Sequence, residues 1–213
     1  MTLKEYLKNP CLKLSIPYWK SKTITMPENM KIVHQNDFCS EFLNEYSDER
    51  YFRLIHYLKN INSEIPYGFS VKRAELTDIP IIVEVINNSY TDLSVSCDQI
   101  ISYTKTQVYN ENLWILIYED TTNRIVGCGI ADFDNEAKEG ILEWIQVLPE
   151  FRGRKIGQLI VNQLLLRMKN ADFATVSGKV NNVTNPERVY RKCGFEGNDI
   201  WHILIKDNNI PKI

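Results

Sequence analysis

Residues 142–167 read LEWIQVLPEFRGRKIGQLIVNQLLLR, and this stretch decides how the chain folds. An apolar run over residues 141–147 resembles a strand and stops at Pro149. A short loop of residues 150–155 follows and carries two arginines, a lysine and a glycine. The next apolar residues recur at helical spacing: Ile156, Leu159, Ile160 and Leu164. The stretch therefore predicts a strand, a basic loop and an amphipathic helix.

This order of elements is how proteins build a phosphate-binding turn. The unpaired backbone N–H groups at a helix N-terminus carry partial positive charge, so an anion binds well there. Gly153 and Gly157 lack a Cβ atom, which lets the backbone approach a ligand closely. The loop fits neither G-x-G-x-x-G nor the Walker pattern, because Gln158 follows Gly157. The alternative is a strand–helix turn that is basic without binding a ligand.

The loop resembles the acyl-CoA pyrophosphate loop of the GNAT acetyltransferase superfamily, V-x-P-x-x-R-G-x-G-x-G. The matching positions are Val147, Pro149, Arg152, Gly153 and Gly157. Lys155 stands where the family usually has its middle glycine. This departure restricts the backbone but adds a cation beside a diphosphate.

A second block, residues 185–195 (NPERVYRKCGF), resembles the family's closing signature Y-x-x-x-G-F. Gly194 suits the left-handed residue that ends a helix. The resemblance implies that Tyr190 lies close to the sulfur of CoA. Val183 occupies the place of the family's usual asparagine, so Asn182 and Asn185 are the nearby candidates for the pantetheine contact.

The resemblance implies acetyl-CoA as cosubstrate and no metal. The implied cofactor-binding residues are Ile145, Gln146, Val147, Arg152, Gly153, Arg154, Lys155, Ile156, Gly157, Asn182 and Asn185.

Two residues are candidates for catalysis. Acyl transfer needs a neutral amine, and an alkyl ammonium has a pKa of about 10.4. A nearby carboxylate can take its proton, directly or through water. Glu143, within an apolar strand, is the candidate base; the alternative is a solvent-facing or salt-bridged residue. Tyr190 would assist the leaving thiolate; the alternative is a core tyrosine. The resemblance also suggests a backbone N–H near Val147 as the oxyanion donor. The isolated His34, His56 and His202 are expected to be structural or surface residues.

Composition narrows the class of protein. The chain has 213 residues, 44% of them hydrophobic and 24% charged, which is ordinary for a soluble globular protein. A net charge of −2 argues against broad nucleic-acid binding. No apolar run is long enough for a membrane span and no apolar signal core opens the chain. Five scattered cysteines form no metal spacing, and free thiols in the cytoplasm are expected.

From residue 69 onward the sequence predicts the order β-α-α-β-β-β-α-β-α-β. A helix capped by Thr77, with Pro80 in its first turn, follows the first strand. The other expected elements are a helix over residues 97–106 and strands over residues 69–74, 113–119, 124–133, 173–180 and 199–205. The resemblance implies an α/β (α+β) fold with a mixed, mostly antiparallel central sheet flanked by helices.

Residues 1–66 lie outside the resemblance and form an expected aromatic-rich, mostly helical N-terminal extension to a GNAT domain of residues 67–213. Apolar residues at helical spacing predict a helix over residues 48–61. These helices either cover the sheet and extend its core, or roof an acceptor pocket or pair subunits as a homodimer.

Two functions follow as hypotheses. The first is N-acetyltransfer from acetyl-CoA to a primary amine by direct attack in a ternary complex. The second is a non-catalytic acyl-CoA-binding or sensor module with the same fold. The acceptor, a small molecule or a peptide amine, is not identified by the sequence. No nucleic acid or membrane partner is expected.

Overall fold

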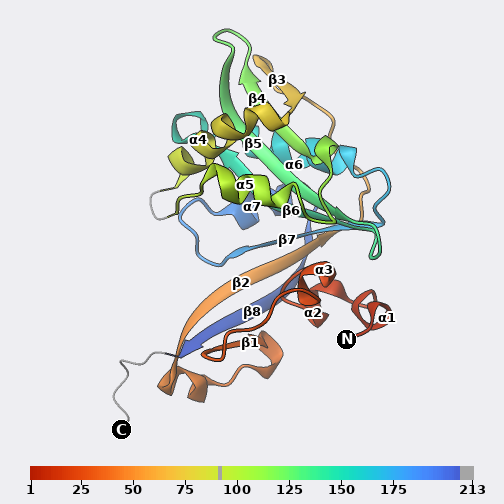
Figure 1. The fold of residues 1–213 in the computed structure, drawn as a ribbon, viewed down its shortest axis with the longest axis vertical. Coiled ribbons are helices and arrows are strands. Elements are labelled where there is room, and N and C mark those ends of the chain that lie inside the picture. The colour runs from red at the N-terminus through yellow and green to blue at the C-terminus, as the bar shows by residue number, and fades with distance from the viewer. Residues whose placement is uncertain (91–92, 207–213) are drawn as a thin grey trace.

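A computed structural model describes residues 1–90 and 93–206 of the chain. Within these ranges, eight strands form one mixed sheet in the order β1-β8-β2-β7-β6-β5-β4-β3 (Figure 1). Neighbouring strands are antiparallel except β6 and β7, which run parallel. The strands are β1 (Met30–His34), β2 (Tyr46–His56), β3 (Phe69–Arg73), β4 (Trp114–Glu119), β5 (Arg124–Asp134), β6 (Glu139–Val147), β7 (Phe173–Lys179) and β8 (Glu196–Lys206).

The helices flank this sheet, so the expected fold class is confirmed, including short helices near the N-terminus. The α-helices are α1 (Leu3–Tyr6), α2 (Pro10–Lys13), α3 (Tyr18–Ser21), α4 (Ile79–Ser89), α5 (Cys97–Tyr103), α6 (Ile156–Arg167) and α7 (Pro186–Lys192). Within the described ranges there are also five 3-10 turns: Gln35–Asp37, Ser40–Asn44, Leu76–Asp78, Glu111–Leu113 and Pro149–Phe151. None of the helices described is both long and apolar enough to cross a membrane.

The helix predicted over residues 48–61 is wrong, because β2 (Tyr46–His56) occupies most of that range. This strand lies between β7 and β8 in the sheet. Its second half, residues 52–56, is buried without interruption. A strand covered on both faces shows a continuous apolar run rather than alternation, and such a run does not distinguish strand from helix. The sheet therefore crosses the expected boundary at residue 66.

The helix predicted after Thr77 is present, but Thr77 does not cap it. Thr77 lies within the 3-10 turn Leu76–Asp78, and Asp78 is the N-cap of α4. Glu75 and Asp78 instead form a reciprocal capping box around that turn.

The two faces of the sheet carry different helices. The β5 glycines Gly127 and Gly129 face α6, and a Cβ on Gly129 would lie 2.4 Å from a side-chain carbon of Ile160. Glycine at these positions lets α6 approach the sheet closely. On the other face, Gln146 of β6 donates a hydrogen bond to Tyr90, directly after α4. Figure 1 shows α4 and α5 in front of the strands and α6 behind them.

The N-terminal helices α1–α3 cover β2, β6 and β7 and form a second, smaller core. Its members are Tyr6, Cys11, Tyr18, Ile55, Ala137 and Phe173.

A buried polar network anchors α1 beneath this second core. The Tyr6 hydroxyl donates to Glu139 Oε2 at 2.8 Å, and Arg53 Nη2 lies 3.2 Å from Glu139 Oε1. Thr175 donates to the same carboxylate. Burial raises the pKa of Glu139, whereas the Arg53 charge lowers it. The short N-terminal helices thus cover the sheet and extend its core. The extension is not mostly helical, because β1 and β2 of the same segment are strands of the sheet.

Candidate active site

The parallel strands β6 and β7 separate partway along their length. They pair from Glu139 and Phe173 as far as Leu142 and Val176. Beyond that point β6 continues beside β5 as far as Val147, and β7 continues beside β2 as far as Lys179. Among the residues that the structure describes, the facing edges of residues 143–147 and 177–178 therefore carry backbone groups that no strand of the sheet satisfies. Such groups need a partner, which makes this fork a natural place for a ligand.

A β-bulge marks the point where the fork opens. Ile130 of β5 pairs with Trp144, and the next residue, Ala131, pairs with Leu142. Glu143 is therefore the extra residue on β6. A bulge bends its strand and re-aims a side chain, and bulges are over-represented beside active sites. Glu143, the candidate base predicted from the sequence, thus lies at the bulge itself.

The predicted phosphate-binding loop lies between β6 and α6. The backbone N–H groups of residues 153–158 have no acceptor among the residues that the structure describes. Gly153 has φ +82°, a conformation that favours glycine, and a Cβ there would meet nothing within 4 Å. A Cβ on Gly157 would make only an ordinary contact with Val189, at 3.5 Å. The loop therefore offers free donors beside open space at the N-terminus of a helix.

Lys155 takes the left-handed conformation, with φ +64°, at the N-cap of α6. The family's glycine at this position avoids the cost of that conformation, which a lysine bears. Its side chain is exposed and makes no ion pair or hydrogen bond with any residue in the described ranges. The cation expected beside a diphosphate is thus available.

The two loop arginines contact the protein itself. Arg152 donates to Ser89 O at 2.7 Å and to Val147 O at 3.3 Å, so it joins the end of α4 to the end of β6. Arg154 stacks over Phe151, with 5.0 Å to the ring centroid, and lies 3.6 Å from Glu119. The structure therefore gives Arg152 a positioning role for the loop.

The other implied cofactor residues fall into two groups. Ile145 and Val147 pair with Gly129 and Gly127 and so lie on the α6 side of β6, and Ile156 begins α6 and is buried. Asn182 and Asn185 stabilise the turn before α7 through their side chains: Asn182 accepts from Thr184, and Asn185 accepts from the Arg188 N–H. The first group, Ile145, Val147 and Ile156, lies at the fork and the start of α6. The second group, Asn182 and Asn185, stabilises the turn between β7 and α7.

Tyr190 of α7 is 8% exposed and packs against Phe52 and Phe195. Burial, and then the proximity of Tyr90, raise the pKa of its hydroxyl. A tyrosine with a raised pKa remains protonated and can donate a hydrogen bond. Tyr90 was not predicted as a site residue, since it comes close to Tyr190 only through the packing of α4 on the sheet.

Glu143 forms an ion pair with Lys20 of α3, with Nζ and Oε1 2.5 Å apart. The side chains are 26% and 24% exposed. Asp132 of β5 lies close by and is almost fully buried. Burial, and then the charge of Glu143, raise the pKa of Asp132 to about 7, while Lys20 lowers it. A carboxylate with a pKa near neutrality is a functional-site candidate.

Sequence reasoning missed both Asp132 and Lys20. Asp132 is a carboxylate inside an apolar strand, the same signal that selected Glu143, and could have been found on that ground. Lys20 lies 123 residues before Glu143, and nothing local connects the two.

The three histidines are buried and structural, as expected. His34 contacts Asp199, His202 contacts Asp48, and His56 accepts the Leu58 N–H. The five cysteines are free.

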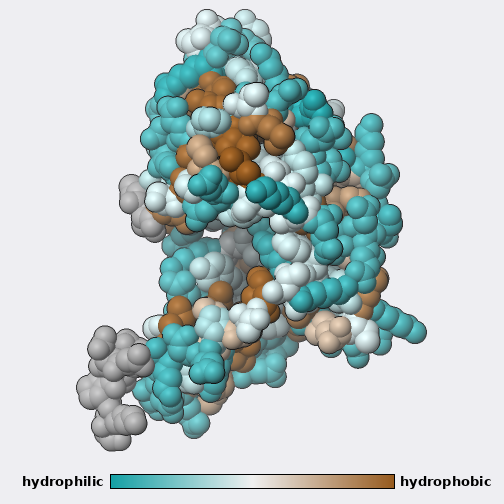
Figure 2. Space-filling view, viewed as in Figure 1, coloured by the Kyte–Doolittle hydropathy of each residue, from teal (hydrophilic) through white to brown (hydrophobic). Residues whose placement is uncertain are grey.

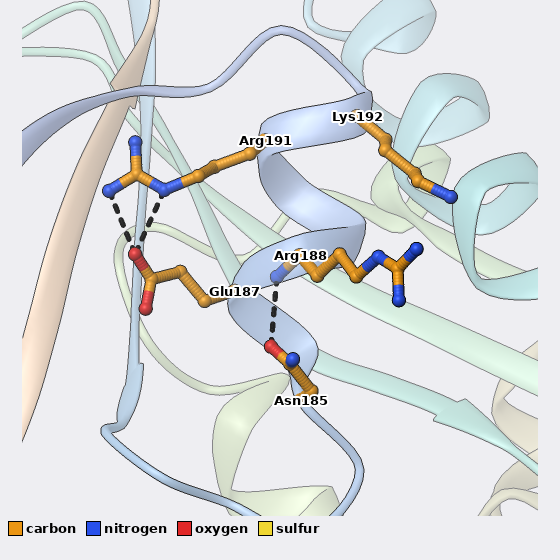
Figure 3. Close-up of a pocket in the computed structure, with 5 residues that line it drawn as sticks. All are labelled: Asn185, Glu187, Arg188, Arg191 and Lys192. Carbon is orange, nitrogen blue, oxygen red and sulfur yellow. Dashed lines mark hydrogen bonds and ion pairs between the residues drawn. The ribbon is translucent and has the colours of Figure 1, made fainter.

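A pocket of about 410 Å³ lies on α7 beside the fork (Figure 3). Its lining residues are Asn185, Glu187, Arg188, Arg191 and Lys192. Arg191 pairs with Glu187 on one side of the helix, whereas Arg188 and Lys192 extend together on the other side. Because Val189 of α7 lies beside Gly157, these two cations extend the positive surface of the loop.

The raised pKa of Asp132 predicts a pH-dependent stability. A buried acid with a raised pKa binds its proton more tightly in the folded state, so its charged form destabilises the fold as pH rises. Asp132→Asn should therefore gain stability over the wild type by roughly 1.4 kcal/mol per pH unit between pH 5 and pH 7. Urea unfolding at pH 5, 6, 7 and 8 measures this difference.

The matched control for Asp132 is Asp172→Asn, which changes an exposed aspartate. It should show no such trend. A constant difference between Asp132→Asn and the wild type across this range would mean that Asp132 is already ionised in the folded protein at pH 5.

The site thus combines a forked mixed sheet with free N–H groups at the N-terminus of a helix. Residues 110–197 match the family model described as an acetyltransferase (GNAT) domain. Over this range the chain is therefore similar to a GNAT acetyltransferase domain. No curated protein matches the sequence.

Solved structures support the same fold. A GCN5-related N-acetyltransferase from Sphaerobacter thermophilus has a TM-score of 0.70 at 16% identity, over 83% of this chain and 58% of that one. A conserved protein of unknown function from Staphylococcus epidermidis has a TM-score of 0.60 at 14% identity, over 97% of this chain and 81% of that one. A GCN5-related N-acetyltransferase from Kribbella flavida has a TM-score of 0.53 at 15% identity, over 85% of this chain and 61% of that one. This chain thus spans about three fifths of the length of the Sphaerobacter and Kribbella proteins.

Proposed function

We propose that this protein transfers an acetyl group from acetyl-CoA to a primary amine by direct attack in a ternary complex. The observation that carries the proposal is the fork between β6 and β7. It has the free N–H groups of residues 153–158 at one end and the carboxylates Glu143 and Asp132 at its opening. One part suits a diphosphate and the other suits an ammonium group.

The loop fits the diphosphate of acetyl-CoA. Six consecutive N–H groups, over residues 153–158, lack protein acceptors within the described ranges, and the space over Gly153 is open. Lys155 supplies a cation at the helix N-terminus, where an anion is already favoured. Arg188 and Lys192 add two more positive charges nearby, which suits a ligand with several phosphate charges.

The amine must lose a proton before or during its attack. Glu143 lies at the opening of the fork and already contacts an ammonium group, that of Lys20. It is therefore suited to take the proton of an acceptor. The nearby Asp132 makes a second carboxylate available for the same proton.

The departing sulfur needs a proton or a hydrogen bond. Burial keeps the Tyr190 hydroxyl protonated, and its helix packs on the first turn of α6. Tyr190 is thus suited to donate to a thiolate that leaves within the fork. The acetyl oxygen would be stabilised by a backbone N–H near Val147.

The second candidate is a non-catalytic acyl-CoA-binding or sensor module. The loop alone would serve that function, whereas a carboxylate pair at the fork would have no role in it. Thiol release from acetyl-CoA in the presence of a panel of small and peptide amines separates the two. Binding of CoA without release for any amine would favour the module.

Binding of CoA is expected to raise Tm through the native state alone. Gly153→Val should abolish this shift, because its side chain would fill the space over the loop. The substitution also costs about 1–3 kcal/mol, since valine is strained at positive φ. Differential scanning fluorimetry with millimolar CoA measures the shift.

Gly68→Val is the matched control for Gly153→Val. Gly68 has φ +85° and equally open surroundings, but it lies before β3, far along the chain from the loop. That variant should lose similar stability and keep the CoA shift. The absence of any shift for the wild type would remove the basis for the cofactor assignment.

A further inference from the structure

We infer that Lys20 is an acetylation site of this protein, modified by its own active site. The inference rests on the proposed function, since it uses the same acetyl donor and the same base. Lys20 Nζ lies 2.5 Å from Glu143 Oε1, at the bulge where the fork opens. A primary ammonium on an alkyl chain thus already occupies the position that the proposed function reserves for an acceptor.

The position of Lys20 is fixed by packing. Its helix, α3, is anchored by Tyr18, which is 6% exposed and stacks on Tyr6 with ring centroids 5.3 Å apart. Tyr6 in turn belongs to the buried network around Glu139. The Lys20 ammonium also lies 5.6 Å from the centroid of the Trp19 ring. A lysine on so short a helix would otherwise be free to sample solvent, so these contacts hold it at the fork.

The surface of the molecule is hollowed on the face that Figure 2 shows. Figure 2 shows a hollow between the surface over α4 and α5 and the surface over β1, β2 and β8. The Lys20 side chain is one quarter exposed, so it is neither sealed in the core nor free on the surface. Reaction within one molecule needs this arrangement, because the amine must reach the fork without unfolding the extension.

The reaction is balanced with acetyl-CoA alone. Glu143 takes a proton from the Lys20 ammonium, and the freed nitrogen lone pair attacks the thioester carbonyl carbon. The C–N bond forms and the C–S bond breaks, and the second proton that the nitrogen loses passes to the departing thiolate. The products are Nε-acetyl-Lys20 and CoA, with one proton released to water from Glu143.

Acetylation would also change the site. An amide carries no charge, so the ion pair with Glu143 would be lost and the carboxylate would lose this cation. External amines would then no longer compete with Lys20 for Glu143. Lys20 would thus be the first acceptor, and its acetylation would remove the positive charge that pairs with Glu143.

Lys22 provides a matched comparison within the same molecule. It lies two residues away and also contacts a glutamate, with 2.6 Å between Nζ and Glu136 Oε2. Its side chain is 41% exposed, and Glu136 lies in the turn after β5 rather than at the fork. Chemical acetylation in solution would modify Lys22 at least as fast as Lys20, whereas acetylation by the site would select Lys20.

The test is incubation of the whole chain with ¹³C-labelled acetyl-CoA, followed by peptide mapping by mass spectrometry over time. Lys20 should be labelled roughly tenfold faster than Lys22 or more, a ratio that corresponds to about 1.4 kcal/mol of selectivity. The fraction labelled per unit time should not change when the protein is diluted tenfold, because the reaction is intramolecular. Glu143→Gln should reduce the Lys20 rate to that of Lys22, and Lys20→Arg should carry no label at residue 20.

A second readout uses external amines. Lys20→Gln, which imitates the acetylated side chain, should raise kcat/KM for a small amine about fivefold over Lys20→Arg, the scale of an exposed ion pair. Equal labelling of Lys20 and Lys22, or a Lys20 rate that Glu143→Gln leaves unchanged, would overturn the inference. If thiol release with external amines still proceeds, the proposed function survives that result. If neither CoA binding nor thiol release occurs with any amine, both fail together.

Discussion

Replacing Glu139 by alanine is expected to lower the free energy of unfolding by about 3–5 kcal/mol, because it leaves a buried guanidinium without its carboxylate. Arg53 and Glu139 have side chains only 2% and 0% exposed. Tyr6 and Thr175 would lose the same acceptor. For a chain of this size the loss corresponds to a fall in Tm of about 10 °C. Urea or thermal unfolding of the purified variant measures it.

Glu136→Ala is the control for that substitution. Glu136 also forms a close ion pair, with Lys22, but its side chain is 54% exposed, so the loss should stay below about 1 kcal/mol. The double variant Arg53→Met with Glu139→Leu removes both charges and should recover much of the stability. Should Glu139→Ala prove as stable as Glu136→Ala, the network would not be what holds α1 on the sheet.

Tyr190→Phe is expected to reduce the rate of acetyl transfer by roughly 10²- to 10⁴-fold, the usual range for a positioned proton donor. Only a hydroxyl is lost, so the packing against Phe52 and Phe195 should survive and CoA affinity should change little. Steady-state thiol release with a turnover-competent amine measures the rate. Tyr109→Phe, in which a half-buried ring packs on Trp114, is the control and should be neutral.

Glu143→Gln should behave differently from Tyr190→Phe as pH rises. The glutamine keeps the shape but cannot take a proton, so activity should recover at high pH, where more acceptor amine is already neutral. Tyr190→Phe should show no recovery of that kind. Wild-type rates for Tyr190→Phe, with release of the thiol limiting, would assign Tyr190 to the core alone.

The parts of the fold that the sequence predicts correctly are those with local signals. The strand, loop and helix of residues 141–167 carry glycines, a proline and a change of apolar period within a short stretch, and all three elements are present. The prediction for the range of β2 is wrong because its neighbours in the sheet, β7 and β8, come more than a hundred residues later in the chain. Tyr51, Leu54 and Ile55 fit a helical period, yet burial on both faces produces the same letters in a strand.

The same distinction applies to the site. The free N–H groups of the loop and the position of Glu143 follow from local sequence, and the structure places them at one fork. The residues that surround the loop and Glu143 in the fold do not follow from the local sequence. Lys20, Tyr90 and Asp132 reach the fork from three different elements, and only the packing of α3, α4 and β5 brings them there.

The place of β2 in the sheet has a consequence for how the chain folds. Ile55 pairs with Thr175, which follows it by 120 residues, and with Glu196, still later. Closing such long loops is entropically costly, and folding slows as contacts become less local. During synthesis on a ribosome, β2 would emerge well before β7 and β8, so both of its edges would stay unpaired until these strands are made. Unpaired strand edges are prone to aggregation. Chaperone demand during synthesis should therefore be set by this strand.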